Sequence, residues 1–445
     1  MANPDNRDRN IEMARRVASE VAKAGGRTFF VGGIVRDWLM GLENKDVDIE
    51  VHGVSVAGLE DILDGLGKRT TMGASFGIMG LRHYDLDIAM PRSEKATGRG
   101  HKDFEVCVDP FIGPKKAAMR RDFTINALMQ DVLTGEVLDF FGGREDLARR
   151  RIRHVCDESY VEDPLRAFRA AQFAARFGFG VAEETRALSA TMDVAALAGE
   201  RVMGELEKAL LKAERPSVFF EQLRGMEQLD VWFSELAALE EPSWRHTLLA
   251  LDAAAPLRSE AEKPLDFMMA ALCFALDGEH GEDAGLSRTK RLLKRLTGEV
   301  QLNQYVLNMS ACRARMAAMV DRGGDELSWM QLFDDSVSPK ELILLERAVR
   351  LSTKPPDRAG DFWNESEGAL WQRLSVYRRR MEAPGLMGRD LIAAGIRPGP
   401  RMGEALALSH RLALMGRPKE EQLQRALAFL GGAGNEKTKQ GDSDD

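Results

Sequence analysis

The pattern of hydrophobic positions changes along the chain, from a mixture of helix and strand periods to an almost purely helical one. Residues 11–24 place apolar side chains at helical spacing up to a Gly-Gly pair, which predicts an amphipathic helix. Residues 28–31 form a short apolar run, and residues 46–51 alternate acidic with aliphatic positions, as expected for strands. A further strand is predicted over 86–89. This mixed region ends near residue 150.

Beyond that point the pattern is helical almost to the end of the chain. Apolar positions recur at helical spacing over 165–177, 202–211 and 286–296. Residues 433–445 are mostly polar and charged, and we expect them to be disordered. The two patterns together predict an α+β protein in which a mixed sheet with helices is followed by all-α domains.

Composition narrows the class of protein. The chain has 445 residues, 44% hydrophobic and 30% charged, which is typical of a globular protein of about three domains. Its formal charge of −8 argues against a uniformly basic surface, so any nucleic-acid partner must contact local Lys and Arg clusters. The four cysteines form no Cys-x-x-Cys pair, which favours a reducing cytoplasm, and no apolar stretch of about 18 residues suggests a membrane span.

Three acidic residues on two predicted strands are candidates for catalysis. Alternation places Asp46 and Asp48 on one face of their strand, and two carboxylates that converge in this way suit Mg²⁺. Taken alone, an Asp-x-Asp pair is also typical of solvated surface acids. Asp87 on the next strand completes a possible catalytic set, although Asp85 shares its face.

A glycine turn and two charged motifs are candidates for binding phosphate or base. Gly32 and Gly33 end a strand just before Arg36, so that a phosphate can approach the backbone; a tight turn with a solvated arginine is the structural alternative. The pair Arg120-Arg121 can neutralise a polyphosphate, although such pairs are common on surfaces. Farther along, Asp163 and Arg166 share one helix face, which also fits a simple ion pair.

In this order and spacing, the motifs Gly-Gly-x-Val-Arg-Asp, Asp-x-Asp, Arg-Arg-Asp-x-Thr-x-Asn and Glu-Asp-Pro-Leu-Arg resemble a known family. They are similar to those of the class II tRNA nucleotidyltransferases, or CCA-adding enzymes, and the bacterial poly(A) polymerases. The resemblance continues through segments 139–155, 162–179 and 200–205 and covers about the first 215 residues.

The resemblance implies a domain order and a set of ligands. We expect a polymerase β-like nucleotidyltransferase head over 1–150 and a helical neck that recognises the nucleotide base over 151–215. A helical body with a degenerate HD-like domain follows over 216–365, and a helical tail over 366–432. The implied cofactor is Mg²⁺, and the implied partners are tRNA, CTP and ATP, with no protein partner expected.

The resemblance also implies roles for individual residues. Asp46 and Asp48 match the metal-binding acids of the family, and Asp87 is the candidate third catalytic acid. The nucleotide-binding residues implied in this way are Gly32, Gly33, Arg36, Arg121, Asp163, Arg166 and Arg169. Gln172 stands where many relatives carry arginine on the same helix.

Hydrogen-bonding patterns support the base-reading role of the helix. Cytosine and adenine both present an amine beside a ring-nitrogen acceptor, so Asp163 can accept from the amine while Arg166 donates to the ring nitrogen. Guanine and uracil reverse both positions and leave the protein groups unpaired, at a cost of about 1–3 kcal/mol each. One protein site can thus select C and A without a nucleic-acid template.

The body resembles the HD phosphohydrolase domain of many bacterial relatives, but its ligands are incomplete. Where those relatives have Cys-His-Asp, this chain has Cys273-Phe274-Ala275, which leaves His246 and Asp277 as the remaining candidate ligands. We therefore expect the domain to pack without hydrolase chemistry.

Several functions compete with complete CCA addition. A poly(A) polymerase is the nearest, followed by an enzyme restricted to the terminal A or to CC. An inactive RNA-binding protein and an HD phosphohydrolase belong to other classes. The acidic C-terminus favours the tRNA enzyme over a poly(A) polymerase, since relatives of the latter often end in a basic extension. The segment 91–119, which we expect to be a flexible loop with Gly98 and Gly100, is uncut. This favours addition of the final A, because relatives that stop after CC have this region shortened.

Overall fold

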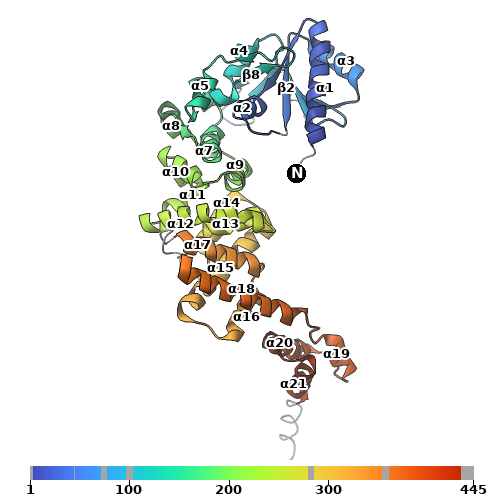
Figure 1. Cartoon of the computed structure of the whole chain (residues 1–445), viewed down its shortest axis with the longest axis vertical. Coiled ribbons are helices and arrows are strands. Elements are labelled where there is room, and N and C mark those ends of the chain that lie inside the picture. Colours follow the sequence, from blue (N-terminus) through green and yellow to red (C-terminus); the bar gives the residue numbers. More distant parts are fainter. Residues whose placement is uncertain are drawn as a thin grey trace, which may run out of the picture. The chain divides into compact units, whose positions relative to one another are not determined.

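The computed structural model describes residues 4–44, 46–71, 78–96, 104–278, 285–352 and 360–431. They fall into two compact units, residues 1–237 and residues 238–445 (Figure 1). The predicted disordered C-terminus lies outside the described residues.

The first unit combines strands and helices. Its strands are β1 (Arg27–Val31), β2 (Val47–His52), β3 (Arg69–Thr71), β4 (Ile78–Leu81), β5 (Leu86–Ala89), β6 (Arg92–Ala96), β7 (Phe104–Val108), β8 (Met129–Asp131), β9 (Val137–Leu138), β10 (Arg151–Ile152) and β11 (Gly180–Val181). Its helices are α1 (Pro4–Lys23), α2 (Gly33–Leu39), α3 (Val56–Leu66), α4 (Pro114–Met119), η1 (Thr124–Asn126), α5 (Gly143–Ala148), α6 (Asp157–Val161), α7 (Leu165–Phe177), α8 (Glu183–Ala190), α9 (Gly199–Lys212), α10 (Ser217–Gly225) and α11 (Leu229–Ala237).

Among the described residues the main sheet has seven strands, in the order β3-β4-β5-β2-β1-β8-β9. Strands β2 and β5 are parallel, and β1 pairs antiparallel with β2 and with β8. Figure 1 shows α1 along the sheet beside β2. Val17 and Val21 of α1 and Ile49 and Val51 of β2 belong to one buried core. Since side chains alternate along a strand, this core fixes the opposite face of β2 for Asp48 and Glu50.

The predicted flexible segment 91–119 begins with an antiparallel hairpin of β6 and β7. The glycines Gly98 and Gly100 of the predicted loop lie outside the described residues. Its last part forms helix α4, which starts after Gly113.

The described part of the second unit is helical. It contains α12 (Glu241–Ala254), η2 (Ala255–Glu260), α13 (Pro264–Cys273), α14 (Ser287–Leu296), α15 (Val300–Arg322), α16 (Glu326–Asp335), α17 (Pro339–Ser352), α18 (Gly360–Glu382), α19 (Gly388–Ala393), α20 (Pro400–Leu414) and α21 (Lys419–Gly431). The α+β fold is thereby confirmed, while the four-domain division stays a prediction.

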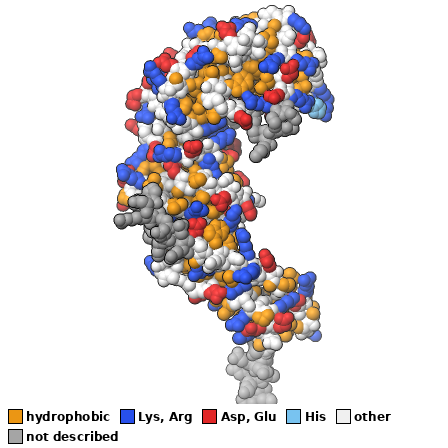
Figure 2. Space-filling model, viewed as in Figure 1, with side chains coloured by type: hydrophobic (Ala, Val, Ile, Leu, Met, Phe, Trp, Pro, Cys, Tyr) orange, Lys and Arg blue, Asp and Glu red, His pale blue; other side chains and the backbone are white. Residues whose placement is uncertain are grey.

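Surface charge and helix hydropathy agree with the composition. Figure 2 shows Lys and Arg interspersed with Asp and Glu over the visible face of both units. Within the described ranges, no helix is long and apolar enough to cross a membrane. Cys156, Cys273 and Cys312 carry free thiols.

Candidate active site

Strand register brings the predicted catalytic acids together. Asp48 of β2 lies directly opposite Asp87 of the parallel strand β5, and Asp46 immediately precedes β2. Burial raises the pKa of Asp48 to about 6, and the charges of Asp87 and Asp46 add to the effect. The pKa of Asp87 is raised by burial and by Asp85 and Asp46. A divalent cation bound by Asp48 and Asp87 would favour the ionised form of both carboxylates.

The register also favours Asp87 over Asp85 as the third acid. Asp85 precedes β5, and its backbone N–H donates to Asn10 of α1 at 3.2 Å. Asp87 is the residue paired with Asp48.

The glycine turn at Gly32 and Gly33 lies next to the side chain of Arg121. Gly32 has a φ of 72°, a conformation that side chains rarely adopt, and a Cβ on it would lie 3.0 Å from Nη1 of Arg121. The backbone conformation therefore favours glycine, and a larger residue would also displace the end of the Arg121 side chain. Arg121 is placed over the turn that the sequence singled out for phosphate.

Arg36 is buried and occupied by protein partners. It forms an ion pair with Asp37 at 2.6 Å and donates to Oδ1 of Asn126 at 2.6 Å. Its guanidinium also stacks over Phe177, 4.7 Å from the ring centroid. A direct contact between Arg36 and a triphosphate would require it to exchange one of these partners.

Several arginines of the candidate site line a cavity of about 260 Å³, which we call the arginine cavity. Four arginines and one acid line it together with apolar residues. The charged lining residues are Glu50, Arg92, Arg120, Arg121 and Arg166. An excess of guanidinium groups makes the cavity suited to a polyanion.

Glu50 is a residue that the sequence analysis missed. Its carboxylate lies 2.8 Å from Nε2 of His52 and 3.5 Å from Nη2 of Arg121. Burial raises the pKa of Glu50, but the hydrogen bond of His52 and the charge of Arg121 together outweigh it and hold the pKa below its ordinary value. Glu50 is therefore ionised at neutral pH. Its place two residues after Asp48 was the signal available in the sequence.

Two residues of the Arg-Arg-Asp-x-Thr-x-Asn motif, Asp122 and Asn126, form a hydrogen-bond network with Arg36 and Arg169. Asp122 accepts from Nε of Arg169 at 2.7 Å, and Asn126 donates to Asp122 at 3.0 Å while it accepts from Arg36. Burial raises the pKa of Asp122, but Arg169 and the hydrogen bonds from Asn126 and Arg169 hold it below its ordinary value. This network connects α2 with α7.

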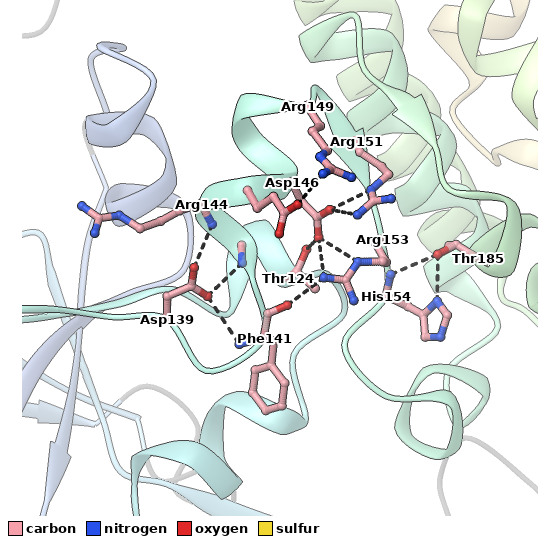
Figure 3. Close-up of polar contacts among 12 residues, drawn as sticks. Thr124, Asp139, Phe141, Arg144, Asp146, Arg149, Arg151, Arg153, His154 and Thr185 are labelled. Carbon is pink, nitrogen blue, oxygen red and sulfur yellow. Dashed lines mark hydrogen bonds and ion pairs between the residues drawn. The ribbon is translucent and has the colours of Figure 1, made fainter.

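A second buried acid, Asp146, contacts residues that lie before and after it in the chain (Figure 3). Asp146 is fully buried; it accepts from Thr124 at 2.6 Å and forms ion pairs with Arg151 and Arg153 at 2.6 and 2.8 Å. Asp139 accepts from the backbone N–H groups around α5, including that of Gly143 at 2.8 Å. The segment 139–155, which carries much of the family resemblance, is thus held in place by hydrogen bonds and ion pairs of Asp139 and Asp146.

The predicted base-reading residues lie at the start of α7. Asp163 forms an ion pair with Arg201 of α9 at 2.8 Å, in place of the Asp163–Arg166 pair considered from the sequence. Arg166 donates to the backbone carbonyls of Ser159 and Arg120 at 2.6 and 2.8 Å and lines the arginine cavity. Arg169 is held by Asp122.

Two of the residues considered for the body have structural partners. The ring of His246 lies edge-on against Phe274 with centroids 5.0 Å apart. The carboxylate of Asp277 accepts from the backbone N–H groups of Arg288 and Thr289 at 2.7 and 2.9 Å, at the start of α14. Asp277 thereby stabilises a helix N-terminus.

Comparison with known proteins gives the family. Residues 28–153 match the model of the poly A polymerase head domain. The chain is 32% identical to a multifunctional CCA protein of Xanthomonas campestris over 429 residues, which cover 88% of this chain and 99% of the relative. The chain belongs to the family of multifunctional CCA proteins.

Other members of the CCA protein family match over a shorter region. A Haemophilus ducreyi protein is 37% identical over 266 residues, or 56% of this chain and 63% of the relative. A Thioalkalivibrio sulfidiphilus protein is 39% identical over 60% of its own length. These two alignments span less than two thirds of the relatives they match.

Solved structures share the fold of this CCA protein family member over nearly its whole length. A Thermotoga maritima CCA-adding enzyme in complex with tRNA has a TM-score of 0.66 and 23% identity, with 96% of each chain covered. An apo form of a CCA-adding enzyme has a TM-score of 0.70 and 24% identity, again with 96% of each chain covered. The predicted resemblance and fold class are confirmed, while the residue roles stay predictions.

Proposed function

We propose that the protein adds CCA to the 3′ end of tRNA from CTP and ATP without a nucleic-acid template. The observation that carries the proposal is the register of Asp48 and Asp87 beside a cavity lined by four arginines. Acids that suit a cation, next to guanidinium groups that suit a triphosphate, are the parts that nucleotidyl transfer needs. Membership of the CCA protein family supports the same reaction.

The proposed reaction is an in-line displacement at phosphorus. The 3′-hydroxyl of the RNA loses its proton to water as its oxygen forms a bond to the α-phosphorus, and the bond from that phosphorus to the bridging oxygen of pyrophosphate breaks. Asp46 and Asp48, with Asp87 beside them, would hold Mg²⁺, which when bound makes the 3′-hydroxyl a better nucleophile and neutralises charge on the phosphates. Arg121 and the Gly32–Gly33 turn would bind the triphosphate.

Selection of C and A is assigned to Asp163 and Arg166. Asp163 lies two residues before α7, and Arg166 lies in its first turn and lines the arginine cavity. Their present partners are Arg201 and two backbone carbonyls, so reading a base would mean exchanging these contacts for the base edge. Arg169, fixed by Asp122, ties α7 to the Arg-Arg-Asp-x-Thr-x-Asn motif.

The second unit would bind the tRNA backbone. Helix α14 buries Leu292, Leu293 and Leu296 and exposes basic residues, which include Lys290 and Lys294. An exposed row of cations over a buried apolar face fits contact with phosphates. The activity would belong to the cytoplasm, where its nucleotide and tRNA substrates occur.

A nucleotide-addition assay on a tRNA transcript that lacks CCA tests the proposal. The wild type should incorporate labelled CTP and ATP with Mg²⁺, and Asp46→Ala or Asp48→Ala should reduce incorporation by at least about a thousandfold. Asp61→Ala, at an exposed position of α3, is the control and should retain wild-type turnover. Wild-type turnover by the Asp46→Ala, Asp48→Ala double variant would refute the metal assignment. A long A-tail would favour a poly(A) polymerase.

A further inference from the structure

Glu50 and His52 lie on the active-site face of β2, and the reaction described above assigns neither of them a role. Alternation along β2 places Glu50 on the same side as Asp48. Glu50 is 8% and His52 5% exposed, and Glu50 lines the arginine cavity. Burying a charged side chain costs free energy unless the charge is paired, so the partners of Glu50 indicate its role.

The two oxygens of Glu50 contact different partners. Oε1 lies 2.8 Å from Nε2 of His52, and Oε2 lies 3.5 Å from Nη2 of Arg121. The ring of His52 packs edge-on against Phe29 of β1, with centroids 5.3 Å apart. His52 is therefore fixed by the core and orients the Glu50 carboxylate toward Arg121.

Arg121 is held between this carboxylate and the glycine turn. Its Nη2 faces Glu50, while its Nη1 lies 3.0 Å from the position that a Cβ at Gly32 would occupy. An arginine side chain loses much rotamer freedom when it is fixed. A fixed acid that restricts Arg121 before the nucleotide arrives reduces the entropy that binding must offset.

We infer that Glu50 is a positioning residue for Arg121 in nucleotide binding, with His52 orienting the Glu50 carboxylate. The inference rests on the proposed function, because the ligand is the triphosphate of CTP or ATP. Since Glu50 acts through Arg121, its loss should weaken nucleotide binding and change the chemical step little.

The test measures steady-state kinetics on tRNA together with equilibrium binding of CTP, so that variants without turnover still give a result. Glu50→Ala should raise the KM for CTP and ATP and the Kd for CTP by about tenfold and lower kcat less than about threefold. Glu50→Gln keeps the shape and one acceptor oxygen and should recover part of the loss. Glu136→Ala removes an exposed acid 3.4 Å from Arg27 and should leave KM, Kd and kcat unchanged.

A double-mutant cycle separates positioning from other roles. With Arg121→Ala already present, Glu50→Ala should change the Kd for CTP by less than about twofold, because the residue it positions is gone. Additive effects would overturn the inference, as would a loss of kcat at unchanged Kd, or a lower melting temperature with unchanged Kd and KM. A wild type that binds CTP but adds nothing to tRNA would instead overturn the proposed function and leave the cycle interpretable.

Discussion

Replacing Asp48 by asparagine should stabilise the metal-free protein while it abolishes nucleotide addition. Burial and the neighbouring Asp87 and Asp46 raise the pKa of Asp48 to about 6, so the folded protein resists ionising this group. A carboxyl group whose pKa is raised on folding destabilises the folded protein at a pH above its folded pKa. At a pH below its unfolded pKa the group is protonated in both states and has no effect on stability. Asparagine has nearly the same shape and cannot ionise.

The magnitude follows from the pKa of Asp48. A change from 3.8 to about 6 corresponds to about 3 kcal/mol of unfolding free energy at pH 8. Because the side chain is partly exposed, solvent screening reduces this to about 1–2 kcal/mol. In a unit of 237 residues that amounts to about 2–8 °C in melting temperature.

Calorimetry of the wild type and Asp48→Asn in EDTA between pH 4 and 8 tests this prediction. The variant should melt higher at pH 8, and the difference should shrink between pH 6 and 4 and vanish below about pH 4. Added Mg²⁺ should stabilise the wild type and not the variant. A variant that melts lower than the wild type in EDTA at pH 8 would refute the account of Asp48 as a carboxylate destabilised by burial and by neighbouring acids.

Four further predictions test other parts of the account. Asp163→Ala or Arg166→Ala should weaken discrimination against UTP and GTP by about 1–3 kcal/mol in four-nucleotide competition, and an unchanged preference would disprove base reading. Deletion of residues 96–103 should stop the product at CC; continued addition of A would remove that segment from the mechanism. Asp146→Ala should cost about 2–4 kcal/mol in urea unfolding because Arg151 and Arg153 lose the buried carboxylate that they share, and a loss below about 1 kcal/mol would contradict this structural role. The wild type should show no Ni²⁺- or Mn²⁺-dependent phosphodiesterase activity; such activity, lost in His246→Ala, would overturn the degenerate HD interpretation.

The elements could be predicted where the hydrophobic period was long and regular. The expected helix at 165–177 matches α7 (Leu165–Phe177), and the strand at 86–89 matches β5 (Leu86–Ala89). The sequence does not predict the antiparallel pair of β6 and β7, because the length and glycine content of this segment favour a loop. A hairpin depends on cross-strand pairing that one strand's pattern does not carry.

The partners of charged side chains could not be predicted in the same way. The sequence places Asp163 three residues before Arg166, but Asp163 pairs with Arg201 of another helix. Likewise, Arg36 is buried against Asp37 and Asn126, 90 residues away from the latter. Ion pairs depend on which elements pack together, whereas the alternation that places Asp46 and Asp48 together is local to one strand.

The measurement that tests the central claim most directly is the 3′-end sequence of products made from a tRNA that ends at its discriminator base. With CTP, ATP and Mg²⁺, the account predicts that the wild type adds C, C and A and then releases the tRNA. Products that end at CC, products that carry a long A-tail, or an unextended tRNA would contradict it.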